Sequence, residues 1–387
     1  MDRDPLARRR PPRVLGRAPR RTGDSRLRWW RKQQSPRRDG GTPQRGSTLV
    51  LAGLVLPVLM ALMALAVDVA RIMLVKDELR RAAEAGALAG AKGLLSTGAI
   101  DWSGAAQRAR DAVTRNTADG TALKDAAIEY GYWNLGTQAW GSSGSFAVGT
   151  SQPVGGSWAP GLRVTVARDT TANGQTNGGP VNLFFGPFVG KALQNVTATA
   201  VAMQSAPGSV TANSLLPMAI NRCMFDQLWN SSTGTPIAVP TTSPYYNAAD
   251  PYEVRIGSQY QYGTCQSGQW NLFTTTDNST GAVQNLLANG NPVGMSVGDL
   301  TYINSGVKNT LYDSVVVNKT YLVAVVTDLS SGYHPIVAFA PFQVTKSVGG
   351  NTKAIYGRFV SLSQFPGSLQ PGGSVYYGTP APPALVR

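Results

Sequence analysis

Hydrophobic and polar positions follow three successive patterns along the chain. From Gly46 to Val67 no residue is charged, and the 22 residues would form a helix of about 33 Å at about 1.5 Å per residue. A bilayer has a hydrocarbon core about 30 Å thick, so this run predicts one transmembrane helix, with Pro57 expected to kink it. Residues 68–92 are rich in Ala, Leu, Glu, Lys and Arg, which predicts that the helix continues past the membrane.

The third pattern begins after about residue 125, where polar and apolar residues alternate as they do in half-buried strands. Clusters of Gly, Ser, Asn and Pro separate the alternating runs, as turns between strands do. A second helix is expected over about 103–116, with Ser103 as its N-cap. The runs that predict strands are Arg163–Ala167, Val196–Met203, Tyr252–Ile256, Tyr321–Thr327, Ile336–Val344 and Ala354–Ser361.

These patterns predict an α+β protein: a single N-terminal transmembrane helix, extended into an amphipathic helix and followed by a β-rich extracytoplasmic region. A stretch of Ser, Thr, Ala and Pro near 205–213 favours a boundary between two β units. The expected segments are a basic disordered tail (1–45), the transmembrane helix (46–67), a helical segment (68–118), a small β-rich module (119–205) and a larger β-rich module (206–387).

Charge is concentrated at the N-terminus. Of the net charge of +14, residues 1–45 carry +11, from 15 Lys and Arg against four Asp. An excess of Lys and Arg marks the cytoplasmic flank of a span, so we expect the N-terminus inside and residues 68–387 outside. The span would keep this tail near lipid, so binding to lipid is favoured and binding to nucleic acid is unlikely. Met1 is the only Met before Met60, and a start assigned too far upstream would also produce such a tail.

Two cysteines, Cys223 and Cys265, lie on the expected outer side, where disulfides persist. We expect them to be bridged, which requires Cα atoms within about 7 Å. Two buried free thiols are the alternative.

Residues for catalysis are scarce. A single histidine, His334, argues against a serine protease triad or a zinc site of the HExxH kind. Segment 186–192 lacks the glycine spacing and the Ser or Thr of a phosphate-binding loop. Asp299, Asp313 and Asp328 are scattered in sequence. We therefore predict no catalytic residue, cofactor, metal or small-molecule substrate.

Several motifs together carry a family resemblance. They are Gln44-Arg45-Gly46, Leu56-Pro57, Ala66-Val67-Asp68-Val69-Ala70-Arg71 and the small-residue run AAEAGALAGAK. Residues 44–92 resemble the N-terminal module of TadG-like proteins of the tight-adherence (Flp) pilus system. The stretches Leu162–Val166, Val181–Phe185 and Val196–Ala200 are similar to the module that often follows, and Gly298-Asp299 with Gly306-Val307-Lys308 is similar to some members.

The resemblance implies a non-enzymatic, membrane-anchored component of pilus assembly or surface adhesion in the bacterial inner membrane. Its partners would be pilus-assembly or pilin-like membrane proteins and membrane lipid. An anchored envelope scaffold or sensor with a basic tail that binds lipid or nucleic acid is one alternative, and an envelope enzyme is another.

The sequence departs from the family pattern at two places. Leu51 stands where some pilus subunits carry Glu, which argues against pilin-type processing at Gly46. Segments 277–281 and 328–332 lack the final Ser of the Asp-x-Ser-x-Ser metal motif of larger relatives.

Two groups of residues on the expected helix are candidates for contacts. Ala82, Gly86 and Gly90 recur every four residues, so they would share one face, packed either against the β-rich body or against another protein's helix. Asp68 and Arg71 are three apart at the end of the apolar run and can pair with each other. They would form either an interface ion pair or, as the resemblance implies, a contact with partner subunits at the membrane edge.

Overall fold

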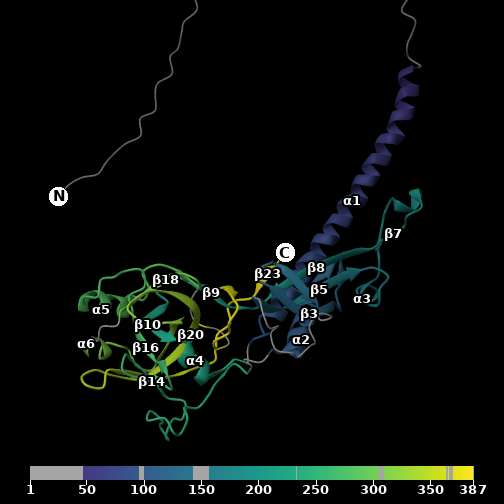
Figure 1. Ribbon diagram of the computed structural model, residues 1–387. Helices are drawn as coiled ribbons and strands as arrows, with labels where there is room; N and C mark the ends of the chain where they lie inside the picture. Colours follow the sequence, from purple (N-terminus) through teal and green to yellow (C-terminus); the bar gives the residue numbers. More distant parts are fainter. Residues whose placement is uncertain are drawn as a thin grey trace, which may run out of the picture. The chain divides into compact units, whose positions relative to one another are not determined.

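The computed structural model describes residues 47–95, 100–142, 157–231, 233–304, 309–362, 365 and 369–386 (Figure 1). The basic tail expected over 1–45, Gly46 and the Gly306-Val307-Lys308 motif lie outside the described residues.

One long helix, α1 (Ser47–Ala91), continues through Pro57 and confirms the prediction of an apolar helix that extends beyond the span. It contains a stretch apolar enough to cross a membrane, with a mean hydropathy of 2.7. The large apolar side chains from Leu49 to Val67 are exposed, whereas one face is buried from Asp68 onward. The helix thus changes from apolar all round to amphipathic, as expected of a helix that has lipid around its first part and protein on one side of its second part.

The second helix, α2 (Trp102–Val113), packs beside the C-terminal half of α1. Its N-cap is Asp101, not Ser103 as expected, because the Asp101 carboxylate accepts the Gly104 N–H at 2.9 Å. This hydrogen bond, together with Arg108, lowers the pKa of Asp101.

Five antiparallel strands form the sheet against which these helices pack. In spatial order the strands are β23 (Ala384–Val386), β8 (Val196–Met203), β5 (Trp158–Arg168), β3 (Ala127–Asn134) and β4 (Ala139–Ser142). The last strand, β23, pairs with β8, so the chain returns to this sheet from its far end (Figure 1). Residues 384–386, which the sequence analysis assigned to the larger module, therefore pair with a strand of the smaller one.

A seven-stranded sheet occupies the region that follows. Its strands are β10 (Leu215–Asn221), β13 (Val254–Ile256), β16 (Gly268–Asn271), β18 (Leu300–Asn304), β19 (Lys319–Val326), β20 (Gly332–Val348) and β21 (Ala354–Phe359). The long strand β20 pairs with both β18 and β19, so the pairings β20–β18–β16–β10–β19–β20 close a ring. Trp270, Phe339 and Phe342 are among the fully buried aromatic side chains of its core.

Short elements connect and cover these sheets. Around the five-stranded sheet lie β1 (Thr117–Ala118), β2 (Thr121–Ala122), α3 (Ala172–Thr176), β6 (Val181–Asn182), the one-turn 3-10 helix η1 (Gly186–Val189) and β7 (Leu193–Gln194). In the rest of the chain lie β9 (Ala206–Val210), α4 (Arg222–Leu228), β11 (Trp229–Asn230), β12 (Thr235–Pro236), β14 (Gln261–Tyr262), β15 (Cys265–Gln266), α5 (Thr280–Asn289), β17 (Met295–Ser296), α6 (Asn309–Tyr312) and β22 (Leu369–Gly373).

The small residues of α1 face the chain's own body. Ala82 is fully buried. A Cβ on Gly86 would lie 2.8 Å from Val113 Cγ2, and a Cβ on Gly90 would lie 2.9 Å from the carbonyl oxygen of Ala105. In this structure α2 and β5 therefore pack against this face, for which the sequence analysis also considered contact with another protein's helix.

This close approach should reverse the usual effect of a Gly→Ala substitution on the stability of a helix. Alanine in place of a helical glycine normally stabilises a helix by about 1 kcal/mol. We expect Gly90→Ala to destabilise the protein instead, by about 1–3 kcal/mol, because the new methyl group meets backbone that cannot move alone. Urea unfolding of the detergent-solubilised protein measures the change. The control is Gly281→Ala in α5, where a Cβ meets nothing within 4 Å and stability should hold or rise. A Gly90→Ala protein as stable as the parent would contradict the packing.

Candidate functional site

The end of the apolar run is marked by a buried carboxylate on α1. Asp68 is the first charged residue after Gly46, and its exposed fraction is only 4%. Its two oxygens accept the backbone N–H groups of Phe184 at 2.8 Å and Phe185 at 3.0 Å. An ionised carboxylate removed from water needs such donors, and two N–H bonds supply them.

One turn further along, Arg71 binds the turn between β1 and β2. Its guanidinium donates to both carboxylate oxygens of Asp119, with nitrogen–oxygen distances of 2.9–3.1 Å. Asp119 and Gly120 both have positive φ, the conformation of a tight two-residue hairpin turn. Glu78, two turns along α1 from Arg71, accepts the Asp119 N–H at 2.8 Å. Arg71 and Glu78 together fix this hairpin to the helix.

The sequence suggested that Asp68 and Arg71 could pair with each other, and the structure gives each of them other partners. Each side chain binds a different segment of the body: Asp68 binds backbone N–H groups after β6, and Arg71 binds Asp119. The folded body brings two backbone N–H donors to Asp68, and it brings to Arg71 a carboxylate whose two oxygens both accept from the guanidinium; charge-assisted hydrogen bonds of these kinds are strong.

Two buried polar side chains support the same end of the body. Arg168 donates to the carbonyl oxygens of Ala118 at 2.9 Å and Gly179 at 2.8 Å, so it joins the end of β5 to the β1–β2 hairpin. Asn177 has no exposed surface and makes four hydrogen bonds, two donated and two accepted. Buried polar groups satisfied in this way hold a fixed geometry.

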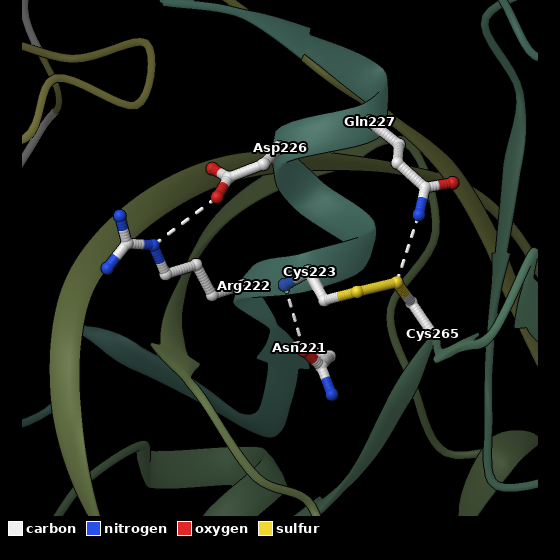
Figure 2. The surroundings of a disulfide bond; sticks show 6 residues. All are labelled: Asn221, Arg222, Cys223, Asp226, Gln227 and Cys265. Carbon is white, nitrogen blue, oxygen red and sulfur yellow. Dashed lines mark hydrogen bonds and ion pairs between the residues drawn. A yellow bond between two sulfur atoms is a disulfide. The ribbon is translucent and has the colours of Figure 1, made fainter.

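A second notable feature is the pair of cysteines (Figure 2). Cys223 lies in the first turn of α4, where the Asn221 side chain accepts its N–H at 2.8 Å. Cys265 begins β15, and the structure joins the two sulfur atoms in a disulfide with the Cα atoms 5.6 Å apart. Gln227 donates to the sulfur of Cys265 at 2.9 Å. The bridge connects α4 to the β14–β15 hairpin.

Aromatic side chains hold the other side of α4. Phe225 packs against Phe359 and Tyr377, with ring centroids 4.4 Å and 4.1 Å away. Tyr377 donates its hydroxyl hydrogen to Asp226 at 2.9 Å, and burial raises the pKa of this tyrosine. Burial likewise raises the pKa of Tyr262, in β14, to about 12. Both hydroxyl groups are therefore protonated at neutral pH, and that of Tyr262 accepts the Arg255 N–H at 2.7 Å.

A pocket of about 580 Å³ lies beside the disulfide. Its lining consists of amide, hydroxyl, aromatic and apolar groups from α4, β14 and the segment 240–245, and carries no Asp, Glu, His, Lys or Arg. Tyr262, whose pKa is raised, is one of its two tyrosines. Nothing in this lining can act as a general base near neutral pH.

Asp328, Ser330 and His334 meet in the turn between β19 and β20, and at first sight their residue types suggest a catalytic triad. The Ser330 hydroxyl donates to Asp328 at 2.9 Å, and His334 Nε2 lies 3.2 Å from the same hydroxyl and 2.9 Å from the Ser330 carbonyl oxygen. His334 Nδ1 is 3.8 Å from the Asp328 carboxylate, beyond hydrogen-bond distance. In a triad the serine proton goes to the histidine and the carboxylate binds the histidine, whereas here the serine donates to the carboxylate. The Ser330 bonds to Asp328 lower the pKa of this carboxyl and stabilise the turn.

The other acidic candidates also stabilise turns. Asp299 accepts the Ser296 N–H at 2.7 Å, and Asp313 accepts the Gly349 N–H at 2.9 Å. In segment 277–281, Asp277 accepts the Ser279 N–H, and Ser279 in turn caps α5. Across the described parts of the chain, no three His, Cys, Asp or Glu side chains gather as metal ligands would.

Sequence reasoning missed the partners of Asp68 and Arg71. Asp119-Gly120 is a hairpin signal that could have been found, since Asp-Gly between two short runs favours a two-residue turn. The family resemblance rested in part on Val181–Phe185 but gave these residues no role. Nothing in the sequence identified Arg168 and Asn177, because their partners are backbone N–H and carbonyl groups of other segments, which any residue type can supply.

Comparison with known protein families finds two matches, both in the part of the chain before residue 203. Residues 46–93 match the Flp pilus-assembly TadE/G-like family, and residues 89–202 match the Tad-like Flp pilus-assembly family. The first match contains Asp68, Arg71 and the small-residue face, and the second contains Asp119 and the segment after β6. No curated protein and no solved structure matches the chain.

The disulfide leads to a second prediction. Loop closure across a sequence separation of 42 stabilises the folded state by roughly 4 kcal/mol in the chain-entropy estimate. We expect a Cys223→Ser, Cys265→Ser double variant to lose stability toward urea by up to that amount. We also expect the non-reduced protein, isolated from the cell envelope, to resist thiol labelling until it is both unfolded and reduced. Labelling of both cysteines after unfolding without reductant would refute the bridge.

Proposed function

Residues 46–202 make this chain a TadG-like protein of the Flp pilus-assembly system, and on that premise we propose that it is a non-enzymatic anchored component of pilus assembly or surface adhesion. The observation that carries the proposal is the continuous helix α1, apolar all round before Asp68 and packed into a β-rich body after it. Such a helix ties the body to a membrane.

The chemistry of the body supports a role in binding rather than in catalysis. Asp299, Asp313 and Asp328 each cap a turn, and the pocket beside the disulfide has no general base. Flp pilus-assembly or pilin-like membrane proteins and membrane lipid are the proposed partners. The excess of positive charge before the span supports an N-terminus in the cytoplasm and a body outside the bacterial inner membrane.

Deletion of the gene tests the role in assembly. We expect the deletion strain to grow normally but to display fewer pili or to attach less to surfaces. Complementation with Asp328→Asn or His334→Gln should restore attachment as fully as the parent gene, because both residues stabilise a turn. Normal pili and attachment in the deletion strain would refute the proposal. Failure of either variant, present at parental abundance, would instead favour an enzyme.

Orientation has its own test. We expect alkaline phosphatase, which is active only outside the cytoplasm, to be active when fused after Arg387. The same enzyme fused after Arg45 should be inactive, since this position lies on the basic side of the span. Activity in the second fusion but not in the first would reverse the orientation.

A further inference from the structure

The segment after β6 exposes a cluster of large apolar side chains. We call residues 183–191 the phenylalanine loop. The exposed fractions are 62% for Phe184, 86% for Phe188 and 82% for Val189. Exposed apolar clusters that are continuous over a protein surface mark sites of contact with a partner or a membrane.

The phenylalanine loop has a defined turn structure. Leu183 donates its N–H to the Ala192 carbonyl at 2.9 Å, and Lys191 donates to the Gly186 carbonyl at 2.9 Å. Gly190, with φ +77°, ends the single turn of η1 in the left-handed conformation that glycine favours. The chain therefore holds Phe188 and Val189 outward on a hydrogen-bonded support.

Asp68 fixes the position of the phenylalanine loop along α1. Its carboxylate accepts the N–H groups of Phe184 and Phe185, and it is the residue at which the uncharged run of α1 ends. Leu65 and Val67, just before it on the helix, are 59% and 48% exposed. The exposed apolar surface of the loop thus lies level with the end of the uncharged run, and exposed Met73 and Leu74 continue the apolar surface of the helix for about one more turn. Figure 1 shows the β6–β7 hairpin that carries the loop extending beside α1.

The flanking charges suit the boundary between lipid and water. The Arg71 guanidinium lies 4.3 Å from the centre of the Phe184 ring, and Lys191 is exposed at the far end of the loop. Aromatic side chains are enriched at membrane interfaces, and Lys and Arg side chains there extend their charged ends toward water. A soluble protein partner would not require the loop to lie at the end of a transmembrane helix, whereas a lipid surface does.

We propose that the phenylalanine loop inserts into the lipid–water interface on the side of the membrane from which the body projects, and that Asp68 positions it there. Phe188 and Val189 enter the interface, while Asp68 is a positioning residue that touches no lipid. The inference rests on the anchoring part of the proposed function and not on a role in pilus assembly. Two attachments, α1 and the loop, would restrict how the body tilts and rotates at the membrane.

Photocrosslinking of the full chain tests the insertion. The protein carries p-benzoylphenylalanine in place of Phe188, is reconstituted in vesicles of phosphatidylethanolamine and phosphatidylglycerol, and is irradiated and analysed by mass spectrometry. We expect phospholipid adducts on the loop. The control carries the same group in place of Val316, an apolar residue 61% exposed on the segment before β19, and should give none. Adducts with a second copy of the chain, or a lipid yield no higher than at position 316, would overturn the insertion.

The positioning role of Asp68 requires a matched pair of variants. Asp68→Ala removes both acceptors for the loop, so the lipid adduct yield at position 188 should fall. Asp68→Asn keeps one acceptor oxygen and should give an intermediate yield. Asp77→Ala removes an exposed carboxylate from the same helix and should change nothing. Each variant must unfold at the same urea concentration as the parent within error. An unchanged yield in Asp68→Ala would overturn the positioning role.

Carbonate extraction of the vesicles distinguishes a failure of loop insertion from a failure of membrane anchoring. Protein that resists extraction but gives no lipid adducts at position 188 contradicts the insertion alone. Protein that is released by carbonate contradicts membrane anchoring itself, and with it the proposed function.

Discussion

The carboxylate of Asp68 is the constraint on which the arrangement of the membrane-proximal end depends. A charge at the end of a long apolar helix is costly unless donors surround it, and few donors exist on a helix whose own N–H groups are already bonded. The structure meets this requirement with two N–H groups from a distant loop. From this residue onward the helix has a buried face, so the same point marks the change from an apolar surface all round to a protein interface.

Two kinds of contact then fix α1 to the body. Near Asp68 the contacts are polar and directional: Arg71 and Glu78 hold the Asp119 hairpin, and Arg168 supports that hairpin from β5. Further along, Gly86 and Gly90 allow α2 and β5 to approach closely, and there the contacts are steric. Polar bonds set the rotation of the helix, whereas close packing sets its distance from the sheet.

The parts of this structure that follow from local patterns could be predicted from the sequence. The long uncharged run and the helical composition after it specified α1, and alternation of polar and apolar residues located β5, β8, β13, β19, β20 and β21, which are half of the strands in the two larger sheets of the described residues. The cysteines could be singled out because the chain has only two. The partners of Asp68 and Arg71 could not be predicted, because they come from residues 119 and 184–185, whose proximity depends on the completed fold. The N-cap of α2 was misplaced by two residues because Asp and Ser both cap helices and Asp101 and Ser103 flank Trp102 here.

The pairing of β23 with β8 also has a consequence for how the protein is made. Strands β5 and β8 are synthesised early, yet the outer edge of β8 stays open until residues 384–386 have been made. An open strand edge is a template for pairing with other chains, so nascent molecules would be prone to misassembly during this interval. Chains that end early would keep that edge open permanently. Closure of this edge of the five-stranded sheet therefore waits for the synthesis of β23, more than 180 residues after β8.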